Sequence, residues 1–502
     1  MSVTDPNLVP ESVTAPAAIP ASQRHPRGLA TLFLTEMWER FSYYGMRALL
    51  VLFLVDTVRG GMGLNDKTAT AIYGLYTAGV YLMALPGGWF ADRICGAQRA
   101  VWYGGIVIAL GHFTLALPMT QTFFLGLIFL VVGSGTLKPN MSGMVGELYP
   151  EGGARRDAGF SIFYMGVNLG AAIGPFVCGW LAKKMGWHWG FAAAGAGMVL
   201  GLIQFRFSRH LLGNAGIRRG NEAPLHLPER VMLYAGIPAV AITVALALVG
   251  WVHVNPVALA KFMAYVILGI GVIFFVIAFL FCGLDKIEKK RVAVIVVLFL
   301  ASALFWAGFE QAGSSFNLFA ERYTVRSLFH FEVPAAWFQM FGPLFVISFA
   351  PVFAWLWVWL ARRHLDPSIP VKFGLGLLFL AAGFLVMLGA TKVIIGGGKA
   401  SPNWLIITYL LHEFGELCLS PVGLSSVTKL APRKLAGQMM GIWFLATSLG
   451  DLLAGLLAGA FDPEAVRSWP HLYLKVILMS AGAGLLLIVF SRPIKRLSAG
   501  IK

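Results

Sequence analysis

Residues 36–45 read Glu-Met-Trp-Glu-Arg-Phe-Ser-Tyr-Tyr-Gly and lie in an apolar run, from about residue 29 to residue 55, long enough to cross a bilayer as a helix. On insertion scales each ionised side chain near the centre of such a helix costs roughly 2.5 to 3.5 kcal/mol, so these charges need partners or water. Glu36, Glu39 and Arg40 share one helical face, which the two tyrosines after them extend by one turn. We therefore expect this face to line a polar cavity.

The whole chain has the composition of an integral membrane protein. Of its 502 residues, 58% are hydrophobic and 12% are charged, whereas about a quarter of the residues of a soluble protein are charged. Because apolar stretches of spanning length recur, we expect an all-α membrane fold with fourteen transmembrane helices. They fall at roughly 31–55, 70–91, 99–118, 122–147, 158–182, 188–208, 231–252, 261–284, 292–313, 337–361, 373–392, 403–428, 438–460 and 472–491.

The net charge of +16 would suit a nucleic-acid-binding protein, but the positions of the lysines and arginines exclude that class. If the N-terminus is cytoplasmic, 25 of these residues fall in cytoplasmic loops and 11 fall on the opposite side. This bias is the one that the positive-inside rule describes. We therefore expect a multi-pass protein with both termini in the cytoplasm and the lipid bilayer, not nucleic acid, as its surroundings.

The spans divide into groups of six, two and six. The longest internal polar interval, residues 208–230, follows the sixth span, and the next two spans carry almost no charge. Two six-helix halves are the architecture of the major facilitator transporters, whose substrate sites lie between the halves. We expect a disordered cytoplasmic tail (1–28), an N-terminal six-helix bundle (29–208), a linker with two extra helices (209–291), a C-terminal six-helix bundle (292–492) and a cytoplasmic tail (493–502).

The turn between the second and third spans carries a second sign of this architecture. Gly88, Asp92, Arg93 and Arg99 have the spacing of the loop signature of the facilitator superfamily, which they resemble. Glycines let helices approach closely, and the charged residues are suited to charge-assisted bonds across the two halves. We expect this loop to lock the cytoplasmic side.

Few other charges lie inside spans, and each is a candidate functional residue. They are Lys138, Glu310, Glu416 and Asp451, together with Arg47, which keeps the face of Arg40 two turns further along. A proline follows Lys138 directly, and another lies five residues after Glu416. Structural ion pairs that hold helices in register are one interpretation; we favour a gated polar cavity between the halves.

Two motifs give the resemblance its specificity. Glu36-x-x-Glu39-Arg40-Phe41-x-Tyr43-Tyr44-Gly45 and Phe160-Ser-Ile-Phe-Tyr164-Met-Gly-Val-Asn168-Leu-Gly resemble the first-helix and fifth-helix signatures of the proton-coupled oligopeptide transporters, the POT or PTR family. The extra helix pair resembles the bacterial branch. The resemblance implies a symporter of the cell (inner) membrane that imports di- and tripeptides with protons by alternating access. It implies no cofactor, since the proton gradient drives transport, and a functional monomer.

The resemblance also assigns residues to the two ends of a zwitterionic peptide. Arg40 and Lys138 would face its carboxylate, with hydroxyl groups from two tyrosines nearby, and Asn168 and Glu416 would receive its amino terminus. The full set of implied substrate-binding residues is Arg40, Tyr43, Tyr44, Tyr76, Lys138, Asn168, Trp306, Glu416, Ser420 and Trp443. For the two tryptophans, packing within the bundle is an equally good interpretation.

Gating and proton coupling are implied in the same way. Arg47 with Glu310 would close the outer side, and Lys138 with Glu416 the inner side. The proton would ride on Glu36, Glu39 or Glu310, with Arg40 tuning the cluster; the sequence does not decide among them. Two histidines within spans, His112 and His412, are better explained as packing residues.

Two positions depart from the family pattern. Gly342 stands where many relatives have an asparagine that helps to hold the peptide amino terminus, and Asp451 stands in a place often given to asparagine. The alternative function is therefore a relative that transports nitrate, drugs or another small solute. A channel should show a filter-like repeated loop or a ring of charge, and an enzyme an activated nucleophile or a metal cluster; since the sequence has neither, we expect no catalytic and no metal-binding residues.

Overall fold

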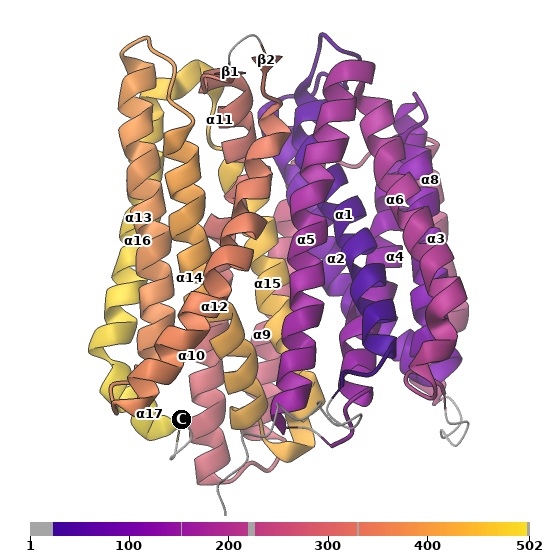
Figure 1. Ribbon diagram of the computed structural model, residues 1–502, viewed down its shortest axis with the longest axis vertical. Helices are drawn as coiled ribbons and strands as arrows, with labels where there is room; N and C mark the ends of the chain where they lie inside the picture. The colour runs from indigo at the N-terminus through magenta and orange to yellow at the C-terminus, as the bar shows by residue number, and fades with distance from the viewer. Residues whose placement is uncertain (1–23, 152, 219–225, 329–330, 499–502) are drawn as a thin grey trace, which may run out of the picture.

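The computed structural model describes residues 24–151, 153–218, 226–328 and 331–498. Most of the predicted tail 1–28 and the last residues of the tail 493–502 lie outside these ranges. Within them the chain is almost entirely helical, and the helices run roughly parallel to the long axis (Figure 1). This agrees with the predicted all-α membrane fold.

The first six long helices form one side of the molecule, at the right in Figure 1. α1 packs against α5 and α6, and α4 packs against both α2 and α3. The π-helix η2 (Ala91–Cys95) follows α2, and the 3-10 helix η3 (Arg209–Leu212) follows α6. The six helices are α1 (Gly28–Val55), α2 (Asp66–Phe90), α3 (Ala97–Leu115), α4 (Thr120–Glu147), α5 (Gly153–Met185) and α6 (Trp187–Ser208).

The C-terminal helices form the other side, at the left in Figure 1. α13 packs against α14 and α16, and α10 packs against α15. The helices are α10 (Lys286–Phe309), α11 (Ser315–Tyr323), α12 (Phe341–Arg362), α13 (Ile369–Ile395), α14 (Asn403–Leu430), α15 (Ala436–Ala458), α16 (Trp469–Val489) and α17 (Ser491–Leu497). Short helical turns join them: η5 (Glu310–Gly313), η6 (Ala335–Met340), η7 (Arg433–Leu435) and η8 (Pro463–Ser468).

The segment between the two sides holds α7 (Leu227–Val231), the π-helix η4 (Met232–Gly236), α8 (Ile237–Leu248) and α9 (Pro256–Leu280). The span formed by residues 229–248 buries none of its apolar window, as expected for a helix that faces lipid. α9 differs from that expectation, because it contacts both α2 and α15 and so lies along the seam between the two sides.

Twelve helical segments of the described chain are long and apolar enough to cross a membrane. α1 and α3 are not among the twelve. α1 nevertheless has 28 residues, and its charged side chains are buried. Their charge lowers its hydropathy, and contacts with α5 and α6 shield it. The charged face thus lies inside the bundle.

The end of the molecule opposite α17 carries a feature that the all-α prediction did not include. β1 (Ser327–Leu328) pairs antiparallel with β2 (Phe331–Glu332), next to α11. We call this end the hairpin end; it is the top of Figure 1. Strands of two residues are too short to produce an alternating pattern in the sequence.

Glycines set the closest helix approaches. A Cβ atom added to Gly87 would overlap the backbone of Gly135, so α2 and α4 touch through their main chains, whereas a Cβ at Gly88 would meet nothing nearer than Pro139 at 4.0 Å. The close approach expected near the loop signature therefore lies at Gly87. Across the seam, Gly74 of α2 meets Gly455 of α15 in the same way.

Substituting Gly87 by Ala should destabilise the protein by about 1–3 kcal/mol, because the new methyl group pushes against main-chain atoms that cannot rotate away. Gly88→Ala is the matched control and should leave the midpoint of thermal unfolding unchanged or slightly raised, since alanine favours the helix. Thermal unfolding of the purified protein in detergent measures both. Equal midpoints for the two variants would contradict the assignment of the close approach.

Candidate functional site

The predicted cluster on α1 forms as the helical spacing requires. The Arg40 Nε atom donates to Glu36 Oε1 at 2.7 Å and lies 3.0 Å from Glu39 Oε2. The three side chains are at most 4% exposed. One guanidinium thus neutralises part of two buried carboxylates, and the trio keeps one excess negative charge.

Lys138 supplies the nearest further positive charge. Its ammonium lies over the ring of Tyr81 at 4.0 Å and over that of Tyr43 at 5.4 Å, and it interacts electrostatically with Glu39 and Glu36. Among the described ion pairs none joins Lys138 to Glu416. The predicted inner gate pair is therefore not formed in this conformation.

The tyrosines of the predicted site stand beside these cations. The rings of Tyr43 and Tyr76 stack at 6.0 Å, and the rings of Tyr43 and Tyr44 meet edge to face at 5.1 Å. Arg40 lies over the ring of Tyr43 and Arg47 over that of Tyr44. Aromatic faces stabilise cations in a dry environment. Through these contacts the three tyrosines and the three cations form one contiguous cluster.

The predicted outer pair is present. Arg47 holds Glu310 through two contacts of 3.2 Å, one from each terminal nitrogen, and this pair joins α1 to η5 on the other side of the seam. Tyr73 donates its hydroxyl to the second oxygen of Glu310 at 3.0 Å. Gly313 makes room for that hydroxyl, since a Cβ at this position would overlap it. The sequence reasoning missed Tyr73, because it lies in an ordinary apolar run.

On α14, three polar side chains share a face. Glu413, Glu416 and Ser420 are spaced i, i+3 and i+7. The carboxyl groups of Glu413 and Glu416, one helical turn apart, interact electrostatically. Glu413 Oε2 and Ser420 Oγ are buried and have no hydrogen-bond partner among the described residues. Glu413 was not among the predicted site residues.

The remaining predicted substrate residues contact neighbours within the helix bundle. Asn168 donates its side-chain amide to the carbonyl of Tyr164 in its own helix at 2.9 Å. Trp306 packs against Phe305 and, through its Cβ, against Gly450. Trp443 lies against Phe373 and fills the space beside Gly423. For both tryptophans the contacts fit packing within the bundle.

Three further buried groups were singled out in the sequence. Asp451 is 1% exposed on α15, and neither of its carboxyl oxygens has a hydrogen-bond partner among the described residues. His412 lies between the rings of Phe309, Phe316 and Phe384. His112 is fully buried. The aromatic surroundings of His412 support its interpretation as a packing residue.

The loop signature contacts the segment between the two sides. Arg93, in η2, holds the carboxylate of Glu229 with two bonds of 3.0 and 3.1 Å, and Trp89 donates to the same carboxylate at 3.1 Å. Asp92 lies beside Arg93 in η2, and Arg99 lies in the first turn of α3. The signature thus ties α2 to the linker helix α7.

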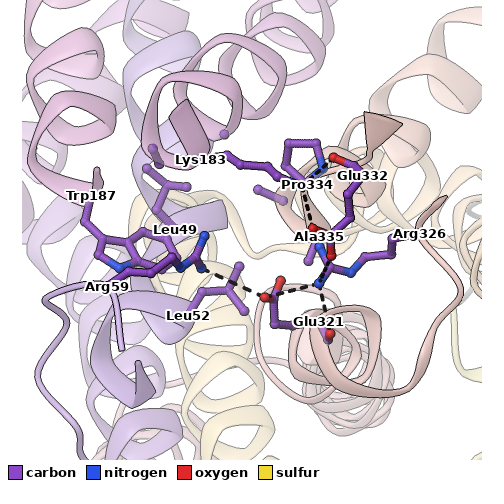
Figure 2. A pocket seen from close by; sticks show the side chains of 13 residues that line it. Leu49, Leu52, Arg59, Lys183, Trp187, Glu321, Arg326, Glu332, Pro334 and Ala335 are labelled. Atoms are coloured by element: carbon purple, nitrogen blue, oxygen red, sulfur yellow. Dashed lines mark hydrogen bonds and ion pairs between the residues drawn. The ribbon is translucent and has the colours of Figure 1, made fainter. Parts of the chain in front are cut away.

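A small hollow of about 40 Å³ lies at the hairpin end. Figure 2 shows that charged side chains from both sides of the seam meet around it. Arg59 and Lys183 come from the N-terminal side; Glu321, Arg326 and Glu332 come from the C-terminal side. Lys183 reaches Glu332 at 2.9 Å, Arg326 reaches both glutamates at 3.1 and 3.2 Å, and Arg59 reaches Glu321 at 3.9 Å. We call these five residues the outer network.

A further ion pair joins the two sides of the seam near the outer network. Arg322 of α11 holds Asp66 at the start of α2 with two bonds, one of them 2.8 Å long.

The hydrogen bond from Lys183 holds the pKa of the Glu332 carboxyl below its usual range. A lowered pKa means that this carboxyl stays ionised until the pH falls below the normal range of a glutamate. The Glu332 carboxyl group therefore keeps its charge between about pH 5 and pH 8.

Comparison with known proteins gives one consistent result. Residues 98–469 match the model of the family described as the POT family. The chain is 44% identical, over 94% of its length and 95% of the relative's, to the peptide transporter YePEPT of Yersinia enterocolitica. It is 36% identical to a di-/tripeptide transporter of Lactococcus lactis, over 95% of the chain and 97% of the relative.

Solved structures agree with these relatives. The fold matches a peptide transporter POT in complex with sulfate with a TM-score of 0.87 and 40% identity, over 95% of this chain and 97% of the other. It matches a POT family transporter in complex with 5-aminolevulinic acid with a TM-score of 0.85 and 34% identity, over 94% and 97% of the two chains. This protein therefore belongs to the POT family of membrane transporters.

Proposed function

We propose that this protein is a proton-coupled symporter that imports di- and tripeptides by alternating access. The observation that carries the proposal is the distribution of buried charge across the seam. Arg40 and Lys138 lie in the N-terminal half beside two carboxylates, while Glu413 and Glu416 lie together on α14 in the C-terminal half. A zwitterionic peptide needs fixed charges of both signs, and relatives named peptide transporters support this substrate class.

The architecture that we propose adds α1 and α3 to the twelve apolar segments of the described chain. The result is fourteen transmembrane helices in two six-helix bundles with a helix pair between them, in the cell (inner) membrane. The excess of lysine and arginine in one set of loops supports cytoplasmic termini. The hairpin end then faces outward. The protein would work as a monomer, without a cofactor, on the proton gradient.

The ion pairs formed between the two halves in this conformation suggest how the two gates work. The outer network, the Arg322–Asp66 pair and the Arg47–Glu310 pair all join the two halves on the outward side. Lys138 and Glu416 are the corresponding pair for the inward side and would meet when the outer contacts open. A peptide carboxylate competes for Lys138, and a proton on Glu36, Glu39 or Glu310 removes one partner of a bridge, so each ligand shifts the equilibrium between the two states.

Uptake into proteoliposomes tests the proposal. We expect a radiolabelled dipeptide to accumulate when an inward proton gradient is imposed, and to equilibrate without accumulation when a protonophore removes the gradient. Nitrate and a cationic drug, each tested in the same vesicles, separate this function from the alternative within the family. Uptake of nitrate or drug in place of the dipeptide would overturn the peptide assignment.

A further inference from the structure

Gly342, at the start of α12, is one of the two positions that depart from the pattern implied by the resemblance, and the structure shows which side chain lies against it. A Cβ atom added to Gly342 would collide with Oε1 of Glu413, and its next two nearest atoms, at 3.4 and 3.9 Å, also belong to Glu413. The carboxyl group of Glu413 therefore lies against the main chain of α12, where a side chain at position 342 would otherwise stand. Only glycine at 342 admits it without a shift.

Nothing in the described protein neutralises this carboxyl group. Glu413 is 6% exposed and takes part in no described ion pair, and its Oε2 atom has no described hydrogen-bond partner. The charged groups that act on it are the neighbouring Glu416 and the more distant Arg47 and Glu310. Because Arg47 and Glu310 are paired with each other, no cation of the described residues forms an ion pair with Glu413.

Two buried carboxyl groups in contact repel each other unless a cation or a proton lies between them. A primary ammonium group suits such a pair, since it carries three donors and one positive charge. Ser420 Oγ, one helical turn beyond Glu416, is also unpartnered among the described residues. The face of α14 thus presents two buried acceptors without a described partner, Glu413 Oε2 and Ser420 Oγ, beside the carboxyl group of Glu416.

We infer that Glu413 is a substrate-binding residue, which holds the ammonium group of the transported molecule together with Glu416, and that Gly342 is required because it makes room for Glu413. The inference rests on the proposed function and extends it. The missing side chain at 342 is thereby replaced by a charged group from the facing helix. The site then discriminates strongly between a free amino terminus and a blocked one.

The test measures this discrimination in proteoliposomes. Uptake of a labelled dipeptide is inhibited with Ala-Ala and, separately, with N-acetyl-Ala-Ala, in the wild type and in Glu413→Gln. We expect the concentration of Ala-Ala for half-inhibition to rise about tenfold or more in the variant, as for the loss of a charge-assisted hydrogen bond. The value for the acetylated peptide should stay nearly constant. The ratio of the half-inhibition concentration of N-acetyl-Ala-Ala to that of Ala-Ala therefore falls. Glu151→Gln, an exposed carboxylate at the other end of the molecule, is the control and should keep the wild-type ratio.

A second variant guards against misfolding of the first. Gly342→Ala displaces only the flexible end of Glu413, so it should fold, and it should lower the same ratio. Gly342→Asn combined with Glu413→Ala returns one polar group to the space and should recover part of the lost discrimination. An unchanged ratio in transport-competent Glu413→Gln or Gly342→Ala would overturn the inference and leave the proposed function intact. No dipeptide uptake by the wild type would overturn both.

Discussion

Substituting Arg40 by Met should abolish dipeptide uptake and destabilise the protein by about 3–5 kcal/mol, the cost of removing one partner from a buried ion pair. Arg40 is the only described ion-pair partner of Glu36 and Glu39, at 2.7 and 3.0 Å. Without it, two adjacent buried carboxylates repel each other with no compensating charge nearer than Lys138. Thermal unfolding in detergent and uptake under a proton gradient measure the two effects.

The loss of stability and the loss of transport can be separated. Adding Glu36→Gln and Glu39→Gln to the Arg40→Met variant removes all three charges and should restore most of the stability, because no unpaired charge remains buried. Transport should not return, since the carboxylate-binding cation and the proton-carrying groups are gone. A single Arg40→Met variant that transports at the wild-type rate would show that the cluster serves helix packing only.

Substituting Glu310 by Gln should reduce proton-driven accumulation of the dipeptide at least about tenfold while exchange of peptide across the membrane without a gradient continues. The amide keeps a hydrogen bond to Tyr73 but loses the charge that Arg47 holds across the seam. Proton binding then no longer changes the free energy of the outer pair, and a ligand without differential affinity for two states cannot shift them. Counterflow and gradient-driven uptake in the same vesicles separate the two activities.

Glu332→Gln is the matched control for Glu310→Gln. Glu332 also bridges the seam at the hairpin end, but its side chain is 58% exposed, and exposed ion pairs contribute at most about 1 kcal/mol. This variant should accumulate dipeptide nearly as well as the wild type. If both variants lost accumulation equally, closure of the outer side as such, and not the titration of Glu310, would limit transport.

Much of the fold was predictable because local physics determines it. Spanning length and apolar composition predicted the long helices, but not that α9, one of the two charge-free spans, lies along the seam. The spacing of Glu36, Glu39 and Arg40 predicted their cluster, since residues three and four apart meet on a helix. The pairing of Arg47 with Glu310 came from family resemblance and is formed in the structure.

Contacts between distant segments could not be predicted in the same way. Tyr73 and Glu310 are 237 positions apart, and Asp66 and Arg322 are 256 apart. No periodicity relates such pairs, because their distance depends on how whole helices are arranged. The outer network left no recognisable pattern in the sequence. One of its residues, Glu332, lies in a hairpin with only two residues in each strand.

The sequence by itself determined that a charged helical face must be shielded inside an apolar bundle, because an ionised side chain in lipid is costly, and it determined which end of the bundle carries the excess of positive charge. Only the tertiary structure decided which groups meet that face and which remain without partners. Gly342 illustrates the difference. In the sequence it is a missing side chain, and in the structure it is the space that the carboxyl group of Glu413 occupies, because a void between helices is filled by whichever neighbour can reach it.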